Sequence, residues 1–319
     1  RVDVVTTRVD TVAGSTGGAW SSNDDPMLAQ FDRLSAVCTC GATRRLYIVG
    51  RNALSMMPLD TITKSLPRHS YSDSKSPSSS ASRSESKSKT FVPNVGPVSL
   101  FVGLKFATQA ASTPGIGTGA GFDRPACCAI VGENAASSSS TVMIGDTAAF
   151  VVRNVSESTR EAGFLFGQNY TAGSAGGSYS MALLQNPAGM TMNGTHALFM
   201  TDAIGNCVRT VDLVAQSVNT LAGTCGGPPG TAEGPLAASR FSQPWGIAFA
   251  GEHEPYVLSV AERHRVRTIN SLSSTTLTYI GTATSGSTNV FPGGFNVPKG
   301  LALSWHNGQR NTLIGDTGN

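Results

Sequence analysis

The sequence predicts an all-β fold, a β-propeller of five four-stranded blades, and three observations lead to this prediction. Short strand-like runs alternate with turn residues, one motif recurs at nearly regular spacing, and the two chain ends together supply one further unit. The unit is clearest at 240–282, where the pattern predicts strands at 245–249, 256–260, 265–270 and 276–281. One such sheet exposes both faces and is unstable alone, so other copies must pack against it.

The motif begins with a large apolar residue and continues into a predicted inner strand. Phe241-x-x-Pro244-Trp-Gly-Ile-Ala is matched from Leu184 and from Phe295, with looser copies from Phe122 and Phe31. Its anchor positions are 34, 125, 187, 244 and 298, which are separated by 91, 62, 57 and 54 residues. The first interval contains a Ser-rich insert, and without it the period is roughly 55 to 65 residues.

The second half of each unit repeats too. Apolar runs ending in Asp occur at 141–146, 197–202 and 312–316, and the first two precede a run containing Val and Arg. The repeat predicts another such run after Asp316, but the sequence ends at Asn319. A run of this type occurs at the other end of the chain, as Arg1-Val-Asp-Val-Val. We therefore expect residues 1–14 to complete blade five, the alternative being that both ends are cut in phase from a longer array.

The remaining blades follow in chain order within a single domain that spans 1–319. Blade one has predicted strands at 33–40, 45–50, 53–58 and 98–104, and blades two to five occupy 122–167, 184–224, 241–282 and 295–319. Between the third and fourth strands of blade one lies a Ser-rich insert at about 68–92. It lacks the aliphatic residues needed to offset ordering entropy, so we expect disorder. We interpret it as a tolerated loop insertion, and the alternative is a phosphorylated or binding segment.

These motifs resemble the NHL-repeat family of β-propellers. The matching features are the x-Pro-x-Gly-Ile/Leu-Ala inner strand, the apolar strand ending in Asp, and the Asn-x-Val-Arg-x-Val type of strand at 206–211 and 265–269. The resemblance covers nearly the whole chain and is best in units three to five, because Leu34 replaces the proline in unit one. It implies a propeller that acts as a binding module, a metal-dependent lyase or lactonase, or an RNA-binding domain.

The composition of the chain bears on its partners and its location. Charged residues make up 13% of the chain and the net charge is +3, which favours neither a nucleic-acid nor a membrane-surface partner. No run of about 18 apolar residues predicts a transmembrane helix. Low charge with many Gly, Ser and Thr suits an extracellular or cell-surface protein, and the absence of an initiator Met and a signal peptide suggests a processed chain or a fragment.

The cysteines predict one disulfide. Cys207 and Cys225 lie equally far from a predicted hairpin turn near Gln216, and opposed residues in antiparallel strands are close enough for a disulfide. Such a bond would indicate an oxidising compartment. For the four cysteines on the inner strands of blades one and two, a cross-blade bond and buried free thiols both stay open: Cys38, Cys40, Cys127 and Cys128.

Other candidate residues receive structural interpretations. Three sequons in predicted turns or connectors permit glycosylation without indicating it: Asn154, Asn169 and Asn193. Repeated aspartates are expected to accept backbone N–H bonds in the turn after the second strand: Asp146, Asp202 and Asp316. Histidines recur after the inner strand of three blades, and repetition explains them without a metal site: His196, His253 and His306.

The predicted function is non-enzymatic binding of a protein or small ligand, with no catalytic residue, metal or cofactor. A basic cluster of Arg263, Arg265 and Arg267 is confined to one blade, whereas RNA binding needs a patch across several blades with aromatic partners. Contacts are expected from Gly-rich loops that emerge on one propeller face, at 15–28, 113–121, 172–183, 225–240 and 283–294. The alternatives are a metal-dependent lyase or lactonase and an RNA-binding propeller.

Overall fold

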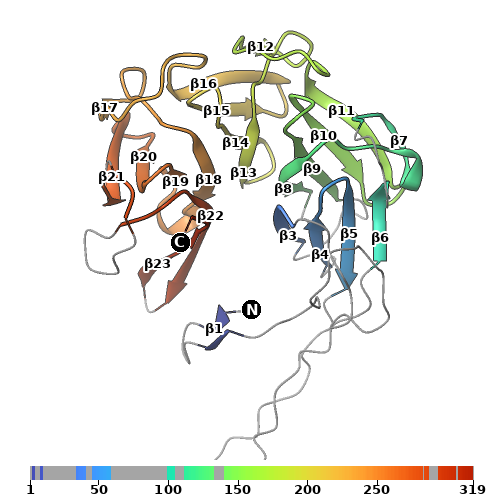
Figure 1. Ribbon diagram of the computed structural model, residues 1–319, viewed down its shortest axis with the longest axis horizontal. Helices are drawn as coiled ribbons and strands as arrows, with labels where there is room; N and C mark the ends of the chain where they lie inside the picture. Colours follow the sequence, from blue (N-terminus) through green and yellow to red (C-terminus); the bar gives the residue numbers. More distant parts are fainter. Residues whose placement is uncertain are drawn as a thin grey trace, which may run out of the picture.

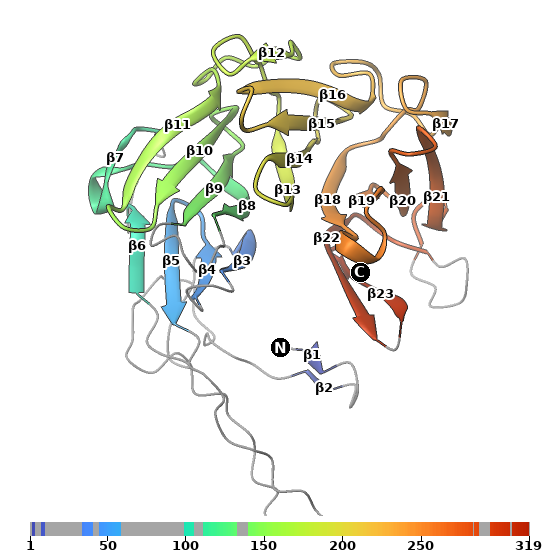
Figure 2. The same cartoon turned by 180° about the vertical axis from the view of Figure 1, so that it is seen from behind.

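The computed structural model describes residues 2–3, 8–9, 34–40, 45–58, 99–104, 111–132, 140–282, 284–286, 294–306 and 308–318. These residues form a β-propeller, with successive sheets arranged around a ring (Figure 1). Figure 2 shows the same ring from behind. The all-β prediction is therefore confirmed. No helix in the described ranges is both long enough and apolar enough to span a bilayer.

Four blades are complete. Blade one contains β3 (Ala36–Cys40), β4 (Arg45–Val49), β5 (Ala53–Pro58) and β6 (Ser99–Gly103). Blade two contains β8 (Pro125–Val131), β9 (Thr141–Asp146), β10 (Val151–Ser156) and β11 (Glu161–Gly167). Blade three contains β13 (Pro187–Asn193), β14 (Ala197–Asp202), β15 (Cys207–Asp212) and β16 (Ser217–Gly223). Blade four contains β18 (Pro244–Phe249), β19 (Val257–Glu262), β20 (Arg265–Asn270) and β21 (Thr275–Gly281).

Short elements occupy the connections between blades. The connectors that precede blades two, three and four carry two-residue strands, β7 (Gly115–Ile116), β12 (Gly177–Ser178) and β17 (Gly234–Pro235). Each adds a fifth strand at the outer edge of the blade that follows it. A short 3-10 turn, η2 (Gly117–Gly119), lies in the first of these connectors, and another, η3 (Gly251–His253), lies within blade four between β18 and β19.

Blade five is represented by two strands, β22 (Pro298–His306) and β23 (Gln309–Asp316), which pair along their whole length. At the N-terminus, β1 (Val2–Asp3) and β2 (Arg8–Val9) pair with each other in a sheet of their own. In the described residues no ladder joins β1 to β23. Completion of blade five by residues 1–14 stays a prediction, which hydrogen exchange at the edge of β23 would test in a chain lacking those residues.

The Pro-x-Gly motif of the inner strands has a physical basis. A side chain at Gly189 would place its Cβ 2.2 Å from Trp245 O, and one at Gly246 would place it 2.4 Å from Lys299 O. In both positions the backbone of the next inner strand approaches too closely for any side chain. The preceding proline lacks an N–H, and the ladder to the second strand shifts register there, as between Pro187 and Gly189.

Blades one and two are joined by several interactions besides apolar packing. The apolar core between them includes Tyr47, Leu54, Phe101 and Phe122. Arg45 and Tyr47 both donate to the buried carboxylate of Glu157, at 2.5 and 2.7 Å. A disulfide joins Cys38 on β3 to Cys128 on β8.

Candidate functional site

The sequence predicted that the Gly-rich connectors emerge as loops on one propeller face. In the structure, three of them instead pair with the outer strands of the blades. The connectors before blades two, three and four fold as hairpins, here called connector hairpins, spanning 113–121, 173–184 and 230–241. Their tips, β7, β12 and β17, pair with the first residues of the outer strands β11, β16 and β21. Of the other predicted loops, 15–28 lies outside the described residues, and 283–294 is described at 284–286 and 294.

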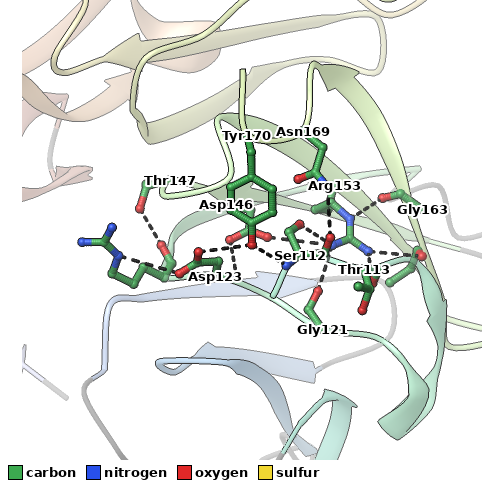
Figure 3. A network of polar contacts seen from close by, with 12 residues as sticks. Ser112, Thr113, Gly121, Asp123, Asp146, Thr147, Arg153, Gly163, Asn169 and Tyr170 are labelled. Carbon is green, nitrogen blue, oxygen red and sulfur yellow. Dashed lines mark hydrogen bonds and ion pairs between the residues drawn. The ribbon is translucent and has the colours of Figure 1, made fainter. Parts of the chain in front are cut away.

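A fully buried arginine in the third strand holds each connector hairpin. Arg153 Nη1 donates to Gly121 O and its Nη2 donates to Thr113 O, both at 2.9 Å, so one guanidinium bridges the two hairpin arms (Figure 3). The matching donor and acceptor sets are Arg209 to Ser174 O and Leu183 O, and Arg267 to Ala232 O and Arg240 O. Because the guanidinium is a planar fork of donors, arginine suits this bridging position.

A carboxylate at the end of the second strand lies beside each arginine. Asp146 Oδ2 is 3.8 Å from Arg153 Nη1, and Glu262 Oε1 is 3.7 Å from Arg267 Nη1. These carboxylates accept a backbone N–H from the loop that leads into the inner strand, in the pairs Asp146 with Asp123, Asp202 with Gln185, Glu262 with Ser242 and Asp316 with Asn296. The predicted bond to the turn after the second strand is found at Asp202, which accepts the N–H of Gly205. The loop that leads into the inner strand is an additional source of donors that the sequence did not predict.

The ionisation of Asp146 leads to a prediction for stability. Burial raises the pKa of Asp146 to about 7, against the opposing effects of the Asp123 N–H and of Arg153. Between its ordinary value of 3.8 and about 7, the folded protein holds a proton that the unfolded chain releases. The free energy of unfolding therefore falls as pH rises through this window, by up to about 1.4 kcal/mol per unit for this group.

We expect Asp146→Asn to remove this pH dependence, because the amide does not titrate. Urea denaturation of the variant and of the wild type at several pH values between about 4 and 7 measures the difference in unfolding free energy. That difference should shift in favour of the variant as pH rises. A difference that stays constant across the window contradicts the prediction.

Blade four departs from this repeat. Its turn between the second and third strands contains two residues, Arg263 and His264, where blades two and three have four-residue turns at 147–150 and 203–206. The carboxylate there is Glu262 instead of Asp. Arg265 replaces the Val151 and Cys207 that begin the third strands β10 and β15.

The short turn leaves an open hollow of about 510 Å³ beside it, here called the blade-four recess. Its lining comprises Pro229, Gly230, Thr231, Ser242, Glu262, Arg263, His264, Arg265, Thr282, Thr284 and Ser285. In blade three, the last residue of the longer turn, Asn206, reaches out instead, donating to Gly227 O and accepting from Gln243 N–H, both at 3.1 Å. The recess is therefore lined by parts of the two predicted loops, 225–240 and 283–294, and by Arg263 and Arg265 of the basic cluster.

The charged groups of the recess differ in how firmly they are held. Arg265 Nε donates to Glu262 Oε1 at 2.6 Å, and 9% of the Arg265 side chain is exposed. Burial raises the pKa of Glu262, while Arg265 and Arg267 oppose that rise. Arg263 is exposed, and its backbone is held from both sides by Ser242 O and by the N–H of Val297. His264 Nδ1 is buried with no hydrogen-bond partner in the described ranges.

A second hollow follows the ring axis. It measures about 610 Å³ and is lined by residues from β3, β8, β13, β18, β22 and β23. The lining is dominated by small and aliphatic side chains, including Ala126, Ala188, Ile247, Leu301 and Ile314. Among the described residues, no group of three or more His, Cys, Asp or Glu is placed to hold a metal ion.

The cysteines whose side chains are described form two disulfides. Cys207 pairs with Cys225 across a Cα separation of 5.0 Å, although its partner in the strand register is Gly223 rather than Cys225. The second disulfide, between Cys38 and Cys128, is the cross-blade bond that the sequence left open. Cys127 is a buried free thiol, and burial raises its pKa to about 12. The side chain of Cys40 lies outside the described residues.

The three sequons occupy different environments. Asn154 lies within β10, between β9 and β11, which corrects its predicted place in a turn. Asn169 is exposed, and its Nδ2 donates to Ser112 O at 3.2 Å (Figure 3). Asn193 is the exposed last residue of β13. Glycosylation of any of them stays a prediction.

The histidines and the basic cluster are dispersed by the fold. His196 is exposed in a turn, whereas His253 stacks on Trp305 with ring centroids 4.4 Å apart. The side chain of His306 is outside the described part of the chain. Arg265 and Arg267 are buried, so Arg263 is the exposed arginine of the predicted cluster.

Comparison with known proteins supports the fold. No family model and no curated protein matches the chain. The crystal structure of an auxiliary nutrient binding protein from Bacteroides thetaiotaomicron aligns with a TM-score of 0.50 at 11% identity, over 96% of this chain and 72% of that chain. A nidogen/laminin complex aligns with a TM-score of 0.48 at 11% identity, over 89% of this chain and 72% of that chain.

One further structure is a protein of unknown function from Bacteroides thetaiotaomicron, with a TM-score of 0.47 and 17% identity. The alignment covers 76% of this chain and 46% of that chain, so the present chain spans less than half of its length. Likeness at these identities shows the β-propeller fold alone. Membership of the NHL-repeat family stays a prediction.

Proposed function

We propose that this propeller is a non-enzymatic binding module that holds a small polar ligand in the blade-four recess. The observation that carries the proposal is the break in the repeat at this blade. Buried carboxylates and arginines that recur in several blades hold connector hairpins, and their recurrence follows from a shared architecture. Arg263, His264 and Arg265 occur at a shortened turn instead, and they line an open hollow.

The recess is suited to small ligands in shape and chemistry. Its volume of about 510 Å³ lies within the range of ligand pockets, and polar side chains converge on it from two connectors and one turn. The two disulfides agree with an extracytoplasmic location, where such bonds persist. Binding through a rigid turn and two connectors leaves the strand scaffold unchanged.

The test is a thermal-shift screen with a paired turn variant. The panel contains neutral monosaccharides, sugar acids, sugar phosphates and amino acids. A ligand present at about 100 times its Kd stabilises the folded state by about 2.7 kcal/mol, which corresponds to roughly 5 °C in Tm for a chain of this size. In the variant, Arg263 and His264 are replaced by the four residues Ala-Ile-Gly-Asn that form the blade-three turn.

The variant should fold with nearly unchanged Tm, because this turn sequence already joins equivalent strands in blade three. Every compound that stabilises the wild type through the recess should lose its effect in the variant. If no compound shifts the wild-type Tm, or if the shifts survive in the variant, the proposal fails. A panel member that binds both chains equally would place binding elsewhere on the propeller.

A further inference from the structure

We infer that the ligand of the blade-four recess carries an oxyanion group, a carboxylate or a phosphate, which Arg263 and Arg265 bind together. This inference rests on the proposed binding function and names the chemistry of its ligand. It follows from the side of the Arg265 guanidinium that remains open, from the charge balance of the recess, and from the hydroxyl groups around it.

Arg265 is held in one orientation with part of its guanidinium unused. The Nε atom donates to Glu262 Oε1 at 2.6 Å, which fixes the plane of the group. Among the described residues its two Nη atoms make no hydrogen bond, and the residue lines the recess. Two parallel N–H donors on a fixed plane match the two oxygens of a carboxylate or phosphate.

The arginine that holds the connector hairpin is a different residue from Arg265, and its equivalent in blade three is Arg209. The Nη2 atom of Arg209 donates to two carbonyls of the connector hairpin, Ser174 O and Leu183 O. In blade four the matching connector carbonyls are bound by Arg267. Blade four therefore has two arginines here: Arg267 holds the connector hairpin, and Arg265 is an additional one that lines the recess.

The charge balance favours an anion. Glu262 is 1% exposed, and it already has Arg265 at 2.6 Å, Arg267 at 3.7 Å and the Ser242 N–H at 2.8 Å. Glu233, on the neighbouring connector hairpin, also interacts with Arg265 and Arg267, so these two arginines are balanced by two carboxylates before Arg263 is counted. Arg263 adds an exposed cation at the same rim, so the accessible side of the recess is positive.

Hydroxyl groups surround the cationic side. Thr231, Thr282, Thr284 and Ser285 line the recess, and the Thr282 hydroxyl donates to Thr284 O at 2.8 Å. Hydroxyls both donate and accept, as do those of a sugar. An acidic or phosphorylated sugar therefore combines the two chemistries that the recess offers, and it provides suitable probes.

The experiment measures binding of D-glucuronate, D-glucose 6-phosphate and D-glucose to the full chain by isothermal titration calorimetry. These probes share a ring and differ in a carboxylate, a phosphate or no charge. We expect at least one charged probe to bind 10-fold or more tightly than glucose, and its affinity to fall as salt is raised. The preferred charged probe reveals which oxyanion the recess takes.

Arg263→Ser is the main variant, because the Arg263 side chain is exposed and its structural contacts are made by the backbone. It should weaken the charged probe about 10- to 100-fold, as expected for a lost charged hydrogen bond. Arg265→Lys keeps the charge but loses the planar fork, and it should weaken binding about 10-fold. Arg124→Ser, at a 75% exposed arginine of blade two, is the matched control and should bind like the wild type.

Two results would overturn the inference while leaving the binding module intact. One is equal affinity for glucose and the charged probes. The other is a neutral compound from the thermal-shift panel that needs the recess, while neither charged probe binds. Failure of every panel compound to bind would reject both the inference and the proposed function.

Discussion

Replacing Arg153 by Met is expected to lower the free energy of unfolding by about 3 to 5 kcal/mol at neutral pH. Arg153 donates to Gly121 O, Thr113 O and Gly163 O, and its side chain is fully buried. Methionine fills a similar volume, but it removes these hydrogen bonds and the cation beside Asp146. Thr113 O and Gly121 O then keep only the N–H that each accepts from the other residue, and Asp146 keeps the N–H of Asp123. Hydrogen bonds from a charged donor contribute about 1.5 to 3 kcal/mol each, so the loss of several from one buried guanidinium accounts for the expected destabilisation.

The measurement is urea denaturation followed by tryptophan fluorescence, with Arg124→Met as the control. Arg124 is an arginine of the same blade whose side chain is 75% exposed, so its replacement should change stability by less than about 0.5 kcal/mol. Hydrogen exchange should also rise in the connector hairpin 113–121 of the Arg153 variant. A loss of less than about 1 kcal/mol would show that the hairpin is held without Arg153.

Removing the Cys38–Cys128 disulfide by a double Ala substitution should lower the free energy of unfolding by about 4 to 5 kcal/mol in the loop-entropy account. The bond joins the inner strands of blades one and two across a sequence separation of 90 residues. Closing so long a loop removes much of the entropy of the unfolded chain.

The double Ala variant at Cys207 and Cys225 is the comparison. That disulfide spans a separation of 18 residues within one blade, so its removal should cost less, about 3 kcal/mol in the loop-entropy account. Denaturation of both variants and of the wild type under non-reducing conditions gives the two differences. If the short-range disulfide contributes as much as the long-range one, loop closure does not determine their effects.

The sequence predicts the propeller well because the responsible signals are local. Strand runs and turn residues define each blade, and the Pro-x-Gly motif marks the points where Gly189 and Gly246 let a neighbouring backbone approach. The four predicted strands of blade four match β18 to β21 within two residues. Alternation and turn chemistry are properties of short segments, so a single sequence reveals them.

The connector hairpins and the recess were not predicted, because their interactions use backbone atoms of distant segments. The acceptors of Arg153 are carbonyl groups of Thr113 and Gly121, whose side chains give no sign of the contact. One feature of the sequence does indicate the recess. In blade four the third strand begins three residues after Glu262, whereas in blades two and three it begins five residues after Asp146 and Asp202. This shorter turn is visible in the sequence once the strands are aligned.

The Cys38–Cys128 bond also changes what a break in the chain would do. The Ser-rich segment lies between β5 and β6, which pair with each other, and the disulfide links residues on either side of it. A polypeptide cut once in that segment would retain its N-terminal fragment covalently as well as through the sheet. Proteolytic nicking there would yield a two-piece molecule that separates only after both reduction and unfolding.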